Sequence, residues 1–424
     1  MDMDRTAAEN SSFRRKKLPR RPYAPRPSIG IMTIHPFRIG IPQADLDDLH
    51  DRLDRTRWPA EIPGSGWSYG VPVDYLRELV HHWRHVYDWR AAEARLNAWP
   101  QFTTTVDGAT VHFAHVRSPE PGATPLILTH GWPGSIVEFL DVVGPLTDPV
   151  AYGGNAADAF HVVVPSIPGF GFSGPTTESG WEAGRIADAW AELMTRLGYE
   201  RFGAQGGDWG AGISRELGRA HPERLIGVHL NLLPGAQQTT EPTEEELAAL
   251  SPAERERTLL SWRSWSAWMA DGPAYALLNS TRPQTVGYGL TDSPVGQLAW
   301  IIEKFREWSD SKELPEEAIG RDLLLTNVMV YWLTRTANSA ARIYYERAHT
   351  TTGRFARPTE PSAAPTALAL FPHELQVPLR HRADRTDTMV RWTEFDRGGH
   401  FPALEEPDLL VGDVRAFFRQ LREG

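Results

Sequence analysis

Apolar residues recur at two spacings along the chain, and these spacings predict the order of its secondary structure. Leu46, Leu49 and Leu53 repeat at helical spacing, and a second amphipathic stripe runs from Tyr75 to Trp83. Beyond it, strand-like apolar stretches occupy 102–106, 111–116, 124–129, 160–165, 201–205 and 224–231, and Asp107-Gly108 between the first two is a hairpin signal. Helix-patterned segments at 181–197 and 211–220 separate the later strands. Such alternation predicts a parallel sheet with helices on both faces.

The alternation is interrupted once, and the interruption divides the chain. A helical, tryptophan-rich stretch covers residues 237–359; strands then resume at 366–371 and 389–395, and a helix closes the chain at 407–422. We therefore expect an α/β core from residues 106–236 and 360–424 with an inserted helical cap. The aromatic-rich segment 34–105 is too short and irregular for a core of its own, so it is expected to wrap the rest. Residues 1–33 are polar, basic and proline-rich, which predicts a flexible extension.

Composition restricts the class of protein. The formal net charge of −10 disfavours a nucleic-acid partner, because phosphate binding needs a surplus of Lys and Arg. The absence of cysteine removes disulfides and thiolate chemistry, and it favours a cytoplasmic protein. No run of 18 apolar residues occurs, and the basic N-terminus lacks the apolar stretch of a signal peptide, so no membrane anchor is expected.

The strongest local motif is Gly206-Gly207-Asp208-Trp209-Gly210, between a predicted strand and a predicted helix. This is the setting of the nucleophile elbow of α/β-hydrolases, here with aspartate at its centre; the alternative is an ordinary helix-capping aspartate beside glycines. A carboxylate is already ionised at neutral pH, so it can attack an electrophilic carbon without a base. The resulting ester would then need water, a base and oxyanion donors for its hydrolysis.

Candidates for these roles follow other strands. The loop His130-Gly131-Trp132-Pro133 comes after strand 124–129, where α/β-hydrolases supply an oxyanion N–H. Because proline has no N–H, the predicted donors are the backbone amides of Trp132 and Trp209. Read otherwise, this loop is only a turn rich in turn-forming residues.

The predicted base is His400, which follows Gly398-Gly399 after the last strand. Glu374 comes just after the preceding strand and could orient the imidazole as the third member of a triad. Asp384 and Asp387 compete for that role, and the residues alone leave the choice open.

Together these motifs resemble the microsomal-type epoxide hydrolases, a family that includes the juvenile hormone epoxide hydrolases of insects. The likeness covers about residues 34–424, including the cap run Thr285-Val286-Gly287 and the segment Phe371-Pro372-His373-Glu374. It implies that Asp208 is the nucleophile, His400 the base and Glu374 the acid. It also implies two cap tyrosines that hydrogen-bond the epoxide oxygen, Tyr275 and Tyr344, with Tyr345 as a neighbouring alternative to the second. Membrane-bound members carry an anchor helix that is not found in this chain.

The expected protein is therefore an α/β-hydrolase with a helical cap that converts a mainly apolar epoxide and water to a vicinal diol through an aspartyl ester. The scheme needs no metal and no cofactor. A haloalkane dehalogenase also uses an aspartate followed by tryptophan, but a departing halide does not need the acidic tyrosine pair. A non-catalytic receptor on the same fold would have no reason to keep Asp208, Glu374 and His400 together. The sequence leaves a homo-oligomer open.

Overall fold

A mixed sheet is the centre of the computed structural model, which describes residues 33–350 and 362–424. The predicted strands are all confirmed as members of this sheet, and an additional short strand joins its edge. In spatial order they are β1 (His35–Phe37), β2 (Gln101–Val106), β3 (Ala109–Val116), β5 (Phe160–Pro165), β4 (Thr124–Thr129), β6 (Phe202–Gly206), β7 (Leu225–Leu230), β8 (Ser362–Leu370) and β9 (Asp387–Glu394). The extension predicted over residues 1–33 lies, apart from Thr33, outside the described residues and stays a prediction.

The sheet is parallel from β5 to β9 and antiparallel at the β1 edge. β4 pairs in parallel with β5 and β6, and the parallel ladder continues through β7 and β8 to β9. β1, β2 and β3 pair antiparallel, and β3 is also antiparallel to β5. In the β2–β3 hairpin, Asp107 and Gly108 have φ angles of 47° and 81°, which a two-residue hairpin turn requires. The predicted parallel sheet is thus found where the motifs lie, and it is extended by an antiparallel edge.

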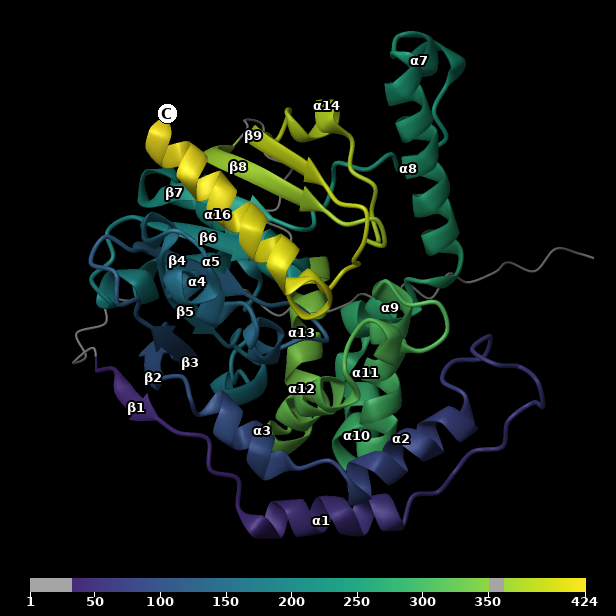
Figure 1. Cartoon of the computed structure of the whole chain (residues 1–424). Coiled ribbons are helices and arrows are strands. Elements are labelled where there is room, and N and C mark those ends of the chain that lie inside the picture. Colours follow the sequence, from purple (N-terminus) through teal and green to yellow (C-terminus); the bar gives the residue numbers. More distant parts are fainter. Residues whose placement is uncertain (1–32, 351–361) are drawn as a thin grey trace, which may run out of the picture. The chain divides into compact units, whose positions relative to one another are not determined.

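Helices cover both faces of the sheet, as the alternation predicts (Figure 1). Neighbouring residues of a strand point to opposite faces of the sheet. Gly203 and Gly206 of β6 are three residues apart, so they face the helix layers on opposite sides of the sheet. A Cβ on Gly203 would lie 2.3 Å from the ring of Phe418, whereas a Cβ on Gly206 would lie 2.3 Å from the backbone of Gly210. The helices of the core are α4 (Val143–Thr147), α5 (Ala183–Arg196), α6 (Asp208–Ala220), α14 (Arg380–Ala383), α15 (Pro402–Glu405) and α16 (Pro407–Glu423). Phe418 belongs to α16 and Gly210 to α6, so these helices lie on opposite faces.

Between β7 and β8 the described residues form seven helices, which make up the inserted cap and are drawn from teal to green in Figure 1. They are α7 (Glu244–Ala248), α8 (Pro252–Asp271), α9 (Ala274–Thr281), α10 (Pro283–Asp292), α11 (Pro294–Trp308), α12 (Arg321–Thr334) and α13 (Ala337–His349). Helix α12 is bonded directly to the loop after β4: the Asn327 amide donates to Pro133 O (2.7 Å) and the Tyr331 hydroxyl to Gly134 O (2.6 Å). The cap therefore lies over the end of the sheet from which the predicted site residues project.

The N-terminal segment contributes β1 and β2 to the sheet and packs helices against the cap. Its helices are α1 (Gln43–Asp54), α2 (Val73–His85) and α3 (Trp89–Leu96). The fully buried Trp83 of α2 directs its indole N–H to the sulfur of Met329 in α12 (3.2 Å), and Arg52 of α1 pairs with Asp292 (3.1 Å). Within the described residues, no helix is both long enough and apolar enough to cross a membrane.

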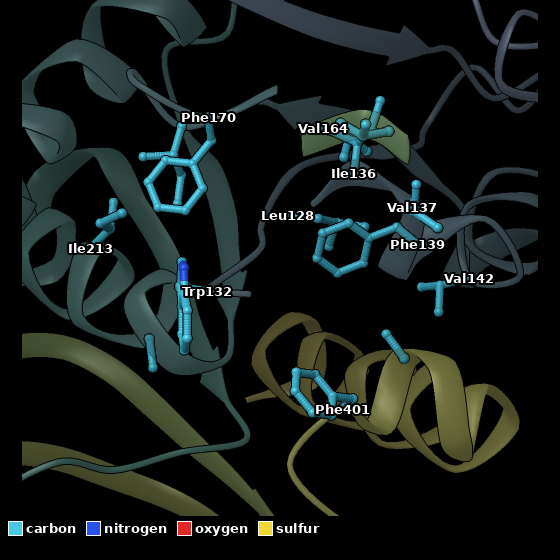
Figure 2. Packing of buried hydrophobic residues seen from close by; sticks show 14 of the residues in the cluster. Leu128, Trp132, Ile136, Val137, Phe139, Val142, Val164, Phe170, Ile213 and Phe401 are labelled. Atoms are coloured by element: carbon cyan, nitrogen blue, oxygen red, sulfur yellow. The ribbon is translucent and has the colours of Figure 1, made fainter. Parts of the chain in front are cut away.

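The hydrophobic core extends up to the loop that follows β4. Figure 2 shows Leu128, Trp132, Ile136 and Phe139 from this stretch together with Phe401 from the C-terminal part of the chain. All of these side chains are at most 3% exposed. The loop that carries the predicted oxyanion donor is therefore anchored on both sides by packed side chains, so it has little freedom to move.

Candidate active site

The predicted elbow is a tight, strained turn between β6 and α6. Asp208 has a φ of 48°, a left-handed conformation that costs energy for a residue with a Cβ, and it begins the helix. A Cβ on Gly206 would lie 2.3 Å from Gly210, and a Cβ on Gly210 would lie 1.9 Å from the carbonyl oxygen of Thr129. Only glycine fits at either position. The turn consequently holds the Asp208 carboxylate clear of the sheet, with 17% of that side chain exposed.

The structure brings the imidazole of His400 between two carboxylates. Its Nδ1 lies 2.8 Å from Glu374 Oε1 and its Nε2 lies 3.3 Å from Asp208 Oδ2. The side chains of His400 and Glu374 are 0% and 1% exposed. The competing acids are engaged elsewhere, since Asp387 pairs with Arg215 (2.6 Å) and Asp384 with Arg380. Of the three acids that the sequence left open, Glu374 is the one that contacts His400.

The charge of this imidazole depends on its neighbours. Burial acts to lower the pKa of His400, but the carboxylates of Glu374 and Asp208 outweigh it and hold this pKa well above its ordinary value. Both carboxylates therefore favour the protonated form of the His400 ring. Loss of the charge on Asp208 would remove one of the two groups that stabilise the protonated ring.

The backbone amide of Trp132 occupies the predicted oxyanion position. It donates to Asp208 Oδ1 at 2.8 Å, while Oδ2 faces His400. Trp209 is the second residue of α6, and amides in the first turn of a helix have no partner within the helix. Its N–H is thus free of helical bonding, as a second donor would need to be.

Both predicted cap tyrosines lie over this carboxylate, one on α9 and one on α13. The side chains of Tyr275 and Tyr344 are hydrogen-bonded to each other, and the Trp209 side chain is hydrogen-bonded to Tyr344. Burial, with the charge of Asp208 nearby, raises the pKa of both phenols, so both stay protonated. Tyr345 instead stacks on His349, with 3.9 Å between ring centres. Of these two neighbouring tyrosines, Tyr344 is therefore the one that contacts Tyr275 and Trp209.

Aromatic rings surround the site from both the core and the cap. Trp132 stacks on Tyr275 with 5.0 Å between ring centres and meets Tyr344 edge-on at 5.8 Å. Trp308 of α11 lies 5.2 Å from Tyr275 and 5.2 Å from His400, and its carbonyl accepts the backbone N–H of His400. A separate cavity of ≈ 800 Å³ opens between α1, α10, α12 and α13 and is lined by other residues. The catalytic candidates are therefore bordered by aromatic rings from both the core and the cap.

Several side chains at the site were not anticipated from the sequence. Trp300, Lys304 and Trp308 are spaced four apart on one face of α11, a pattern visible in the sequence but unconnected to any motif. Glu138 lies behind the oxyanion loop, where its carboxyl accepts the N–H of Gly131, and burial beside Asp208 raises its pKa to about 8. Among the described residues, no cluster of three or more His, Cys, Asp or Glu has the arrangement of a metal site.

Comparisons with known proteins show which proteins this chain is similar to. Residues 34–139 match the family described as "Epoxide hydrolase N terminus", and residues 124–287 match "alpha/beta hydrolase fold". A Stigmatella aurantiaca protein, named provisionally as an epoxide hydrolase, is 48% identical, with 92% of this chain and 86% of that protein covered. Epoxide hydrolase 1 of Oryctolagus cuniculus is 35% identical over 91% of this chain and 88% of its own. The juvenile hormone epoxide hydrolase of Bombyx mori has a TM-score of 0.82 at 29% identity, covering 92% and 96% of the two chains.

Proposed function

This chain belongs to the epoxide hydrolase family and has the α/β-hydrolase fold, and we propose that it hydrolyses its epoxide through a covalent ester on Asp208. One observation carries the proposal. The Asp208 carboxylate has one oxygen bonded to a backbone amide and the other directed at a histidine, beneath two hydrogen-bonded phenols. A nucleophile, an oxyanion donor, a base and two acids thus converge on one small volume.

In the first half-reaction, Asp208 Oδ2 attacks a ring carbon and the bond from that carbon to the epoxide oxygen breaks. Oδ2 is the oxygen suited to this attack, because Oδ1 already accepts the Trp132 N–H (2.8 Å). The oxygen that leaves is a strong base and takes a proton from Tyr275 or Tyr344. The product is a hydroxyalkyl ester on Asp208.

In the second half-reaction, water attacks the carbonyl carbon of this ester. His400, held by Glu374 through its Nδ1 (2.8 Å), takes the proton of the water at Nε2. The negative charge then develops on Oδ1, where the amides of Trp132 and Trp209 would stabilise it. Collapse of this intermediate breaks the bond to the substrate oxygen, which takes the proton back from His400, and the diol is released. The remaining carboxyl proton returns to the tyrosine that acted as the acid, so the Asp208 carboxylate and the phenol are both restored.

The proposed substrate is a mainly apolar epoxide. The rings of Trp132, Tyr275, Trp308 and Tyr344 contact one another around the reacting carboxylate. A site walled by aromatic side chains favours an apolar ligand with few polar groups. The ammonium of Lys304, which lies beside Tyr275, is paired with glutamates on its own helix and is therefore not available to an anionic substrate.

The experiment uses His400→Ala, in which the ester should form and persist. Removal of a general base costs about 10²–10⁴-fold in its own step, so intact-protein mass spectrometry should show an adduct of one substrate mass, and digestion should locate it on Asp208. Asp208→Asn is the matched control and should form no adduct. A chlorinated alkane offered to the wild-type enzyme should release no halide.

A single turnover in heavy-oxygen water fixes which bond the water breaks. With enzyme in excess, the first diol should be unlabelled and the heavy oxygen should remain in Asp208. Heavy oxygen in that first diol would mean direct attack of water on the epoxide, and the covalent scheme would be wrong.

A further inference from the structure

A lysine ammonium lies buried beside the candidate acid Tyr275. Lys304 of α11 is 4% exposed, and burying an ammonium is costly unless it is paired. Its Nζ contacts Glu303 Oε1 at 2.6 Å and Glu307 Oε2 at 2.8 Å. These glutamates explain how the charge is tolerated, but they do not explain why a charge is kept at this position.

The ammonium also faces two aromatic rings of the site. Its Nζ lies 5.2 Å from the ring centre of Tyr275 and 5.9 Å from that of Trp308. Both distances are within the range over which a cation is attracted to an aromatic face. Trp308 in turn contacts the imidazole of His400 edge-on, at 5.2 Å between ring centres. Lys304 therefore lies against two rings of the site, that of the candidate acid Tyr275 and that of Trp308.

We propose that Lys304 is a positioning residue for epoxide opening, acting through Tyr275 by stabilising the negative charge that develops on its phenol. This inference rests on the proposed role of Tyr275 as a proton donor. When the phenol gives its proton to the epoxide oxygen, electron density on the ring increases. A cation over the ring face is attracted more strongly to the ring in that state than to the neutral phenol. The interaction therefore lowers the barrier of the first half-reaction.

Glu307, which acts on Tyr275 in the opposite direction to Lys304, makes the sign of the proposed effect on the acidity of Tyr275 testable. Burial raises the pKa of Tyr275, and the charges of Asp208 and Glu307 raise it further. Lys304 opposes all three contributions, because a positive charge favours the deprotonated phenol. Removal of Lys304 should make Tyr275 a weaker acid, whereas removal of the Glu307 charge should make it a stronger one.

The experiment measures the alkylation rate in a His400→Ala background, where the ester accumulates and its mass can be followed after rapid quenching. Lys304→Met should slow alkylation roughly tenfold, the size of a partly desolvated cation–π contact. Lys304→Arg keeps a cation and should retain most of the rate. Glu307→Gln should speed alkylation by about two- to threefold, because one opposing charge is lost. With His400 intact, ester hydrolysis should change less than twofold in each variant.

A second background separates this inference from the proposed function. If Lys304 acts through the phenol, Lys304→Met should have little further effect once Tyr275 is Phe, since the two changes then share one interaction. If Lys304→Met and Glu307→Gln slowed alkylation equally, the proposed role of Lys304 would be wrong. The same would hold if Lys304→Met slowed alkylation by the same factor with and without the Tyr275 hydroxyl. Neither result would affect the proposed function. Undiminished alkylation in a protein with Phe at both 275 and 344 would instead overturn the proposed acids.

Discussion

At the scale of single residues, the imidazole of His400 is controlled by two carboxylates with different fates. Glu374 is 1% exposed and neither makes nor breaks a covalent bond in the proposed cycle. Asp208 loses its charge when it becomes an ester. Because both carboxylates raise the pKa of His400, ester formation should lower that pKa and favour the neutral imidazole that the second step requires as a base.

The two half-reactions should consequently respond differently to pH. Ester hydrolysis needs neutral His400, so its rate should rise with pH and level off above the pKa of His400 in the ester state. Alkylation does not need neutral His400 and should show no such rise. Single-turnover measurements of both steps across pH would establish this.

Glu374→Gln serves as the matched variant. Loss of a carboxylate lowers the pKa of His400, so the rise in hydrolysis should move to lower pH while the plateau falls. A shift to higher pH, or a hydrolysis rate that is flat with pH in both proteins, would contradict the assignment of His400 as the base.

At the scale of elements, the site joins parts of the chain with very different local signals. The elbow, the oxyanion loop and the base each lie in a run of a few residues where glycine or proline marks a required backbone conformation, as the φ of 48° at Asp208 illustrates. Local sequence was therefore enough to predict where these residues lie in the fold, and their catalytic roles stay a proposal. Lys304, Trp308 and Glu138 reach the site through the packing of whole helices and loops, and local sequence carries no information about which helix lies over which strand end.

The two cap tyrosines were predicted, but not from a local motif. Nothing in their local pattern distinguishes Tyr275 and Tyr344 from the other tyrosines of the chain, and the family resemblance identified them. The structure brings them together because α9 and α13 pack side by side, with 5.9 Å between the two ring centres. The membership of the chain in an epoxide hydrolase family confirms the resemblance, whereas the roles of these residues stay a proposal.

The phenols of Tyr275 and Tyr344 should share the role of proton donor to the epoxide oxygen. Tyr275→Phe or Tyr344→Phe alone should slow alkylation roughly 10- to 100-fold, since one phenol remains, and the double change should slow it by about 10⁴-fold. Rapid-quench mass spectrometry would give these rates. Tyr345→Phe is the control and should leave alkylation unchanged, because that ring stacks on His349. Wild-type rates in the double variant would rule out both tyrosines as donors.

At the scale of the whole molecule, residues far from the chemistry hold the cap against the sheet. Helices α1 and α2 contact α11, which carries Lys304 and Trp308, and α3 contacts α12. Helix α12 bonds the oxyanion loop through Asn327 and Tyr331. The N-terminal segment is thus part of the support of the site, which is consistent with the wrapping role expected from its sequence. A cytoplasmic location and the oligomeric state stay predictions.

Trp83 offers a test of this support. Its side chain is 1% exposed, and its indole N–H meets Met329 of α12 at 3.2 Å, so Trp83→Ala leaves a cavity between the N-terminal segment and the cap. Loss of a buried tryptophan costs about 3–5 kcal/mol of unfolding free energy. Urea unfolding followed by circular dichroism should show that loss, and alkylation should slow as the cap loosens. Arg55→Ala is the control. The Arg55 side chain, just after α1, is 74% exposed, so its loss should change the free energy of unfolding by less than about 0.5 kcal/mol. If Trp83→Ala instead melts in a separate early transition that leaves alkylation intact, the segment only covers the cap and does not hold it in place.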